Sequence, residues 1–329
     1  MRLLALTTAV LVDPLAAQED GAFTLRQTGS DDRVNLNLQY GDGTSNHGRT
    51  FERSAFSDVR RAGDRITFVL RRPAGTFTFD GRGSLDRASG SYDFAPNAEF
   101  RKELERLGFR EVDTRALFVF ALDDLTIAQV GQLQKLVSDK LDTAQLVRLI
   151  NHGAGVRYVQ AMTDAGFRSL GSDEYRRARD HGVSADFARE MAALGIKLPL
   201  EELVRLRDHG VTPDYVRAMR AAGHKVGSDE LVQARDHGVT PDFIQRMTAL
   251  GHGGLALADY IRMRDHGVSP EFVESIRDAG LDKVTASDLV RLRDHGISAS
   301  YVRRTRELFK ETPTVDQIIR LRTRGDLAR

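Results

Sequence analysis

Apolar and polar residues alternate one by one in several short segments of the first hundred residues. Arg33–Tyr40 places an apolar side chain at every second position, and residues 66–70, 76–80 and 91–94 repeat this alternation. Successive side chains of a strand point to opposite faces of a sheet, so the period of two predicts β-strands in these segments.

Residues 19–96 are therefore expected to form a small antiparallel β-rich domain built from strands and hairpins, with residues 72–75 (Arg-Pro-Ala-Gly) as a turn. A unit of fewer than about 80 residues buries a limited core, and the chain has no cysteine to cross-link it. We expect the sheet to pack against the helices that follow it and to serve as their N-terminal cap.

After residue 97 the apolar residues follow a helical spacing, and the chain begins to repeat itself. The dipeptide His-Gly occurs six times at intervals of 28 or 29 residues. A fixed period of this size is typical of a stacked array of repeats. The six members of this histidine row are His152, His181, His209, His237, His266 and His295.

Each repeat is predicted to contain two helices of about ten residues. In the first helix, apolar residues fall six and three positions before the histidine, and the glycine after the histidine ends the helix. In the second helix, an aromatic row six positions after the histidine and a methionine-rich row ten positions after it share one face, which we interpret as core between repeats rather than a ligand groove. The aromatic row is Tyr158, Phe187, Tyr215, Phe243, Phe272 and Tyr301.

The helix boundaries and the ends of the array are also visible. Thr212-Pro213 and its equivalents predict an N-cap followed by proline at the first helical position. Degenerate copies place Phe94, Asp123 and Arg324 in the histidine position. The predicted fold is mostly α: a short-period α-solenoid of about eight two-helix units over residues 97–325, with a tail at 326–329. Leucine-rich repeats are excluded because no alternating leucine strand occurs.

The first eighteen residues predict export. Met1-Arg2, an apolar run and a small-residue segment ending at Gln18 are typical of a signal peptide, although Asp13-Pro14 interrupts the run; a disordered or packed N-terminus is the alternative. No later segment is long and apolar enough to span a bilayer.

The charges nearly cancel, with 48 basic and 47 acidic residues, which argues against a nucleic-acid partner. Acid, arginine and aspartate recur at steps of three along the first helices, a spacing that allows intrahelical ion pairs. These triads are Glu174/Arg177/Asp180, Glu202/Arg205/Asp208, Asp259/Arg262/Asp265 and Asp288/Arg291/Asp294.

An arginine row lies two positions before the histidines. Its members are Arg179, Arg207, Arg235, Arg264 and Arg293. We favour an interpretation in which the aliphatic stems cover the seam between helices and the charged heads reach water. In the alternative, the row is a candidate partner-binding surface that grips the carboxylates of an extended partner.

The histidine row has a structural interpretation, which we favour, and two functional ones. In the first, each imidazole lies at the end of a first helix and bonds a loop carbonyl of the adjoining repeat. In the others the row binds metal or responds to pH. Shared metal sites conflict with the spacing of packed helices, about 8 to 10 Å, because zinc-bound nitrogens lie about 2 Å from the ion. We therefore expect no metal and no cofactor, and keep pH response as a secondary hypothesis.

The segment Leu203–Gly223, with the strand segment Gly75–Phe94 and the helix from Asn97, resembles the repeat regions of bacterial exported proteins. Similar regions are appended to the extracytoplasmic end of membrane metallopeptidases of the beta-lactam-sensor type. The likeness covers most of residues 34–325. The chain lacks that peptidase's zinc-binding histidine-glutamate motif and its membrane helices, so the resemblance implies sensing or docking outside the cytoplasm and not proteolysis.

These observations predict a monomeric, non-enzymatic scaffold in the periplasm or outside the cell that binds a protein or peptide. No phosphate-binding glycine loop, nucleophile elbow or cysteine nucleophile is present in the sequence. The alternative is a sensor whose solenoid binds a small envelope ligand. An enzyme assembled from dispersed residues is the third possibility.

Overall fold

The computed structural model describes residues 19–40, 43, 46–309 and 312–325. The predicted signal peptide (residues 1–18) and tail (residues 326–329) lie outside this part of the chain. The described chain divides into two compact units, one ending at Asp180 and the other beginning at His181. The first unit holds a β-sheet and six helices, and the second holds ten helices within the described residues.

The sheet has seven antiparallel strands in the order β3-β2-β1-β7-β6-β5-β4. The predicted strands are confirmed as β2 (Arg33–Tyr40), β5 (Arg65–Arg72), β6 (Gly75–Ser84) and β7 (Arg87–Pro96), with the turn at residues 73–74. Three further strands were not predicted: β1 (Glu19–Gln27), β3 (Asn46–Glu52) and β4 (Phe56–Ala62). The edge strands β3 and β4 each bury a single residue, so alternation is nearly absent from their sequences.

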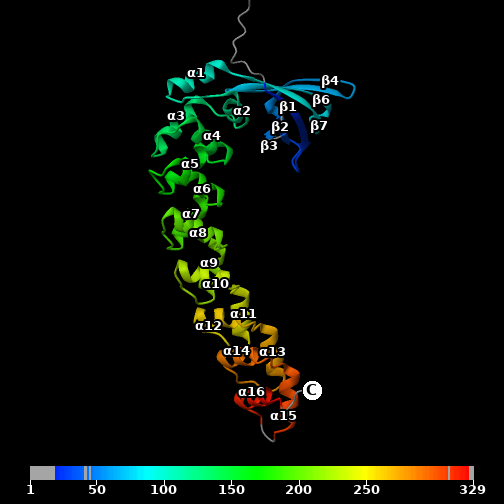
Figure 1. Ribbon diagram of the computed structural model, residues 1–329, viewed down its shortest axis with the longest axis vertical. Coiled ribbons are helices and arrows are strands. Elements are labelled where there is room, and N and C mark those ends of the chain that lie inside the picture. The colour runs from blue at the N-terminus through cyan, green and yellow to red at the C-terminus, as the bar shows by residue number, and fades with distance from the viewer. Residues whose placement is uncertain (1–18, 41–42, 44–45, 310–311, 326–329) are drawn as a thin grey trace, which may run out of the picture. The chain divides into compact units, whose positions relative to one another are not determined.

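One face of the sheet and helix α2 (Thr114–Leu122) share a core. The ring of Phe118 lies 4.6 Å from Tyr40, 5.2 Å from Phe77 and 5.4 Å from Phe94, measured between centroids. Eight of the nine α2 residues are buried, which accounts for the helix having almost no polar positions. The sheet therefore packs against the first helices, as its small size led us to expect (Figure 1). Phe94, which the repeat register placed in the histidine position, lies in β7 and belongs to this core.

Within the described residues, sixteen α-helices follow the sheet. The first helices of the repeats are α2, α4 (Thr143–Asn151), α6 (Ser172–Asp180), α8 (Leu200–Asp208), α10 (Ser228–Asp236), α12 (Leu257–Asp265), α14 (Ala286–Asp294) and α16 (Val315–Arg324). The second helices are α1 (Ala98–Arg106), α3 (Ile127–Leu136), α5 (Val156–Asp164), α7 (Ala185–Ala193), α9 (Pro213–Ala221), α11 (Pro241–Ala249), α13 (Pro270–Asp278) and α15 (Ala299–Glu307). A β domain followed by a helical repeat region, as predicted, is thus the fold.

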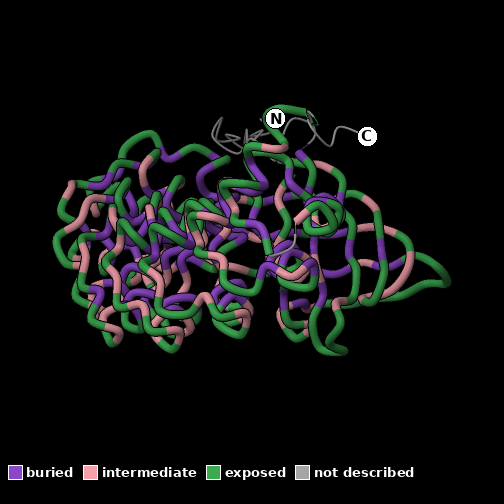
Figure 2. Tube along the Cα trace, turned by 90° about the horizontal axis from the view of Figure 1, so that it is seen from below, coloured by how far each residue is buried: buried purple, intermediate pink, exposed green. Residues whose placement is uncertain are grey.

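Each unit stacks its helices in two layers. In the first unit α2, α4 and α6 pack in one layer and α1, α3 and α5 in the other. In the second unit α10, α12, α14 and α16 form one layer, and α7, α9, α11, α13 and α15 form the other. Figure 2 shows buried and exposed segments alternating along the chain, as amphipathic helices require. The methionine-rich row is core, with Met162, Met191, Met219 and Met247 fully buried.

The predicted caps are present. Thr212, Thr240 and Ser269 each accept a hydrogen bond from the amide three residues on, and proline follows each of them. First helices end in a Schellman motif: the Gly210 amide donates to the Arg207 carbonyl and the Val211 amide to the Leu206 carbonyl. Local sequence therefore sets where each short helix starts and stops.

Among the described residues, no single helix has the length and apolar composition to cross a membrane. The helix pair α2 and α3 has this length and composition when the two are taken together, but they are bent by 92° at their junction.

Candidate functional site

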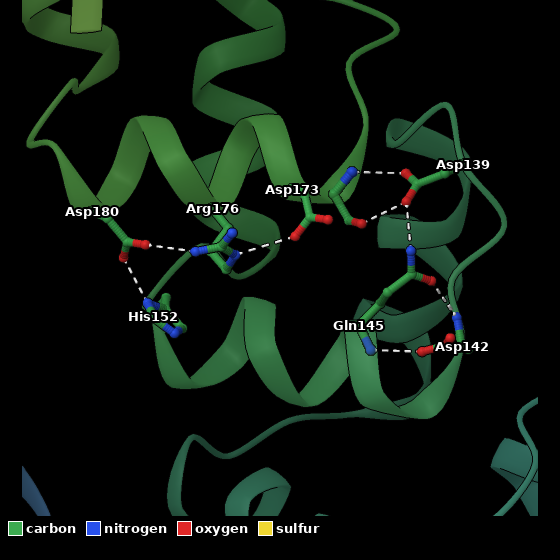
Figure 3. Close-up of polar contacts among 8 residues, drawn as sticks. Asp139, Asp142, Gln145, His152, Asp173, Arg176 and Asp180 are labelled. Atoms are coloured by element: carbon green, nitrogen blue, oxygen red, sulfur yellow. Dashed lines mark hydrogen bonds and ion pairs between the residues drawn. The ribbon is translucent and has the colours of Figure 1, made fainter.

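Five junctions between consecutive repeats are joined by a histidine–aspartate contact. The histidine is the C-cap of a first helix, and its Nδ1 lies 2.6 to 2.7 Å from the carboxylate of the next repeat's aspartate. Figure 3 shows one case, His152 with Asp180, whose other carboxylate oxygen accepts from Arg176. The five pairs are His152–Asp180, His181–Asp208, His209–Asp236, His237–Asp265 and His266–Asp294.

These contacts correct two predictions. The histidines lie at the helix ends, as expected, but their partner is a carboxylate of the next repeat and not a loop carbonyl. The aspartates that close the four triads each contact a histidine of the preceding repeat, and Asp180 also accepts a hydrogen bond from Arg176 of its own helix. The first pair of the triad is present at Arg205–Glu202 and Arg291–Asp288.

The carboxylate partner defines the imidazole chemistry. Because a carboxylate only accepts hydrogen bonds, Nδ1 must carry the proton in each pair, whether or not the ring is charged. The histidine side chains are 37 to 43% exposed. Within the described residues no group of three histidine, cysteine, aspartate or glutamate side chains could hold a metal ion. The row therefore offers donors and acceptors at a surface, one repeat apart.

The arginine row makes a second contact across the same junctions. Each guanidinium lies over the aromatic-row ring of the preceding repeat, with its carbon 5.1 to 5.3 Å from the ring centroid. The pairs are Arg179–Tyr158, Arg207–Phe187, Arg235–Tyr215, Arg264–Phe243 and Arg293–Phe272. The residues are exposed, yet their heads stack on rings instead of simply extending into water as the favoured interpretation held. Arg207 also donates from Nε to the Gly182 carbonyl, at 3.1 Å.

The glycine after each histidine completes the junction. Gly210 has φ +69°, and a Cβ built there would lie 3.3 Å from Nε of Arg235. The equivalent distances at Gly153, Gly182, Gly238 and Gly267 are 3.2 to 3.5 Å, also to an arginine-row nitrogen. Glycine is thus required for the left-handed turn and for the close approach of the next arginine. We call these five residues, histidine, glycine and aromatic of one repeat with arginine and aspartate of the next, the junction set.

Members of the junction set are all replaced at the first junction, and only the aspartate is replaced at the last. At the first junction, between α2 and α4, the histidine position holds Asp123 and the aspartate position holds Asn151, while Gln129 replaces the aromatic and Ile150 the arginine. At the last junction Arg322 lies over Tyr301 at 5.2 Å, and the aspartate position that would meet His295 holds Thr323. These pairs could have been found in the sequence by comparing the aromatic and histidine positions of one repeat with the arginine and aspartate positions of the next. The same comparison adds Arg322 to the arginine row.

Cavities recur beside the junctions. One of about 220 Å³ lies near the N-terminus of α5, and one of about 570 Å³ lies near that of α15. Six corresponding positions line both: Gln129, Ile150, Gly153, Gly155, Val156 and Arg157 in the first, and Phe272, Arg293, Gly296, Ser298, Ala299 and Ser300 in the second. We call these cavities the junction notches.

A larger cleft of about 870 Å³ lies in the first unit. It is lined by the start of β3 (Asn46 and His47), the loops that precede α2 and α4, and the first turns of those two helices. Burial, with Arg49 and Arg115 nearby, lowers the pKa of His47. Sequence patterns did not predict this cleft, because its walls come from segments about a hundred residues apart.

No protein-family model matches the chain, and no curated protein is similar to it.

Proposed function

We propose that the chain is a non-enzymatic scaffold that binds an extended segment of another protein along its junction notches. The observation that carries this proposal is the recurrence of one set of six positions around a cavity in both units. The same positions recur along the stacked helices. An extended polypeptide presents its side chains at regular intervals, so it suits a surface of this kind.

The dimensions of the two partners agree. Packed helices lie about 8 to 10 Å apart and an extended chain advances about 3.3 Å per residue, so about three residues of a partner would span one repeat. The notch at α15 is lined by Ser298, Ser300, Phe272 and Arg303, and the hydroxyls of the two serines are hydrogen-bonded to each other. Hydroxyls can both donate to and accept from a peptide backbone, and the ring gives a partner side chain an apolar contact.

The junction set itself is occupied in holding repeats together. Because each arginine-row guanidinium stacks on a ring and each aspartate bonds a histidine, a partner that gripped these groups would have to displace contacts between repeats. We therefore place partner recognition in the notches and keep direct binding by the arginine row as the weaker version. A periplasmic or secreted location rests on the resemblance and on residues 1–18, and it forms part of the proposal.

A photo-crosslinking residue at Ser300 tests the proposal. Ser300 lines the notch, whereas Ser287, equally exposed on α14, lies outside the described cavities and is the matched control. With envelope extract of the source organism, we expect irradiation to yield polypeptide adducts at position 300 and not at 287. Equal adducts at both positions, or retention of a small molecule with no polypeptide adduct, would reject the scaffold in favour of sensing.

A further inference from the structure

The cleft of the first unit differs in charge from corresponding surfaces of later repeats. Its rim carries Arg110, Arg115, Lys140 and Arg148, and its floor is formed by Ala116, Val119, Leu141 and Val147. A volume of about 870 Å³ falls in the range of small-molecule sites. An apolar floor beneath a rim of cations is a suitable arrangement for an organic anion.

Internal comparison shows that one of these cations, Arg148, lacks the acids that pair with the corresponding arginines of α8 and α14. On α8 and α14 the arginine four positions before the histidine pairs with an acid on its own helix and another on the next first helix: Arg205 with Glu202 and Asp229, and Arg291 with Asp288 and Asp316. Arg148 occupies the same position on α4, where the acid of its own helix is replaced by Gln145.

The acid on the neighbouring helix is engaged elsewhere, because Asp173 pairs with Arg176 at 3.2 Å. Position 144, where the corresponding acids are Asp229 and Asp316, holds alanine. Within the described residues, no ion pair is formed by Arg110, Lys140 or Arg148. The cleft therefore keeps an arginine that the corresponding ion pairs neutralise on α8 and α14.

The acids of the rim do not restore the balance. Asp113 and Asp142 are N-caps whose carboxylates accept the amides of Ala116 and Gln145, each at 2.7 Å. Their negative charge is directed to helix N-termini, where it is stabilised by the helix dipole. Glu111 is the remaining acid among the lining residues.

We propose that this cleft binds a small organic oxyanion, with the anionic group between Arg148 and Lys140 and an apolar body on Ala116, Val119 and Val147. Guanidinium and ammonium groups both bind carboxylates and phosphates through charge-assisted hydrogen bonds, so the shared chemistry is the oxyanion. This activity is additional to the scaffold, and its site lies in the other unit from the tested notch at Ser300, so either proposal can fail alone.

Calorimetric titration of the full chain with 4-phenylbutyrate, phenyl phosphate and the neutral 4-phenylbutanamide tests the proposal. We expect saturable binding of at least one anion and at least about tenfold weaker binding of the amide, since a charge-assisted hydrogen bond contributes about 1.5 to 3 kcal/mol. A preference for the carboxylate or for the phosphate supports the site and identifies its anion. Binding of the amide as tight as that of the anions, or no saturable binding of any probe, would overturn it.

Two matched pairs of variants locate the binding. Ala144→Asp places a carboxylate at the second position of α4, where the helix dipole favours it, and Ser287→Asp does the same on α14. Arg148→Gln removes an unpaired cation, and Arg205→Gln removes a paired one. We expect Ala144→Asp and Arg148→Gln to weaken anion binding about tenfold with unchanged thermal unfolding, and the two controls to bind as wild type. Equal losses in variant and control would reject the cleft as the site.

Discussion

The first junction and the later ones solve the same packing problem with different residues. Between later repeats a histidine bonds an aspartate and an arginine stacks on a ring. Between α2 and α4 none of these residues is present, and Asp123, in the histidine position, is held instead by Arg49 of the sheet through two hydrogen bonds of 3.0 and 3.2 Å. The partner of the residue in the histidine position thus comes from the β domain and not from the next first helix.

This difference shows which parts of the junction set can be lost separately. At the first junction all five members are replaced, whereas at the last junction Arg322 keeps its ring, Tyr301, although Thr323 stands in the aspartate position after His295. Two other replacements on α4, Ala144 and Gln145, remove acids that pair with arginines farther along, and Arg148 of the first-unit cleft has no ion pair among the described residues. The end of the array that adjoins the sheet is therefore also the place where charge is available to a ligand.

Glycine substitution should produce the largest effect. Gly210→Ala forces alanine into φ +69° and brings its Cβ against Arg235, so we expect the free energy of unfolding to fall by about 2 kcal/mol. Gly223 ends a second helix at φ +93° with no atom within 4 Å of a Cβ, and Gly223→Ala should cost about 1 kcal/mol. Chemical denaturation measures both, and equal losses would show that the arginine contact contributes nothing.

The arginine–ring stack should be visible as a coupling energy. We expect Arg264→Met and Phe243→Leu, alone and combined, to give a coupling of about 0.5 to 1 kcal/mol in a double-mutant cycle of unfolding free energies. The first junction supplies the control, because Ile150 and Gln129 hold these positions without a cation and a ring. If the two losses of unfolding free energy are strictly additive, the contact between Arg264 and Phe243 contributes nothing to stability.

The histidine–aspartate pairs should contribute less, because both partners are exposed. We expect replacing His209, His237 and His266 together by glutamine to lower the midpoint of thermal unfolding modestly, each exposed pair being worth about 0 to 1 kcal/mol. Repeating the measurement from pH 5 to pH 8 examines the pH hypothesis. A triple variant whose profile runs parallel to that of wild type would dismiss histidine titration as a contribution to stability.

The smallest effect concerns an acid between two second helices. The pKa of Glu271 is lowered to about 2 by its own backbone amide, by the Ser269 hydroxyl and by Arg246. Because this pKa lies below the unfolded value of 4.5, the ionised Glu271 side chain stabilises the folded chain above pH 4.5. The stabilisation is lost as pH falls towards 2. We therefore expect Glu271→Gln to lose less stability than wild type between pH 5 and pH 2 in chemical denaturation, and equal losses would contradict the assignment.

The sequence-based predictions were accurate for interactions between residues close in the chain and failed for interactions between distant residues. Caps such as Thr212 and Ser269 and the turn at residues 73–74 were predicted because their partners lie within a few positions. The edge strands β3 and β4 were missed since each has one neighbour and one buried residue, and their conformation depends on the strand beside them. The aspartates were assigned to the wrong partner because the spacing of three on a helix was an equally good local explanation.

The sequence by itself determined the β domain, the repeat length, the two helices of each repeat and the residues that end them, because periodicity, capping and glycine conformation act within one or two turns. The tertiary structure alone decided which residues meet across a junction. Those contacts join positions that lie about one repeat apart in the chain, and only the offset between stacked helices brings an arginine onto the preceding ring or an aspartate to the preceding histidine. It also decided that the cations near α4 face a cleft, since Arg148 and His47 come to line the same cavity only when the sheet packs on α2.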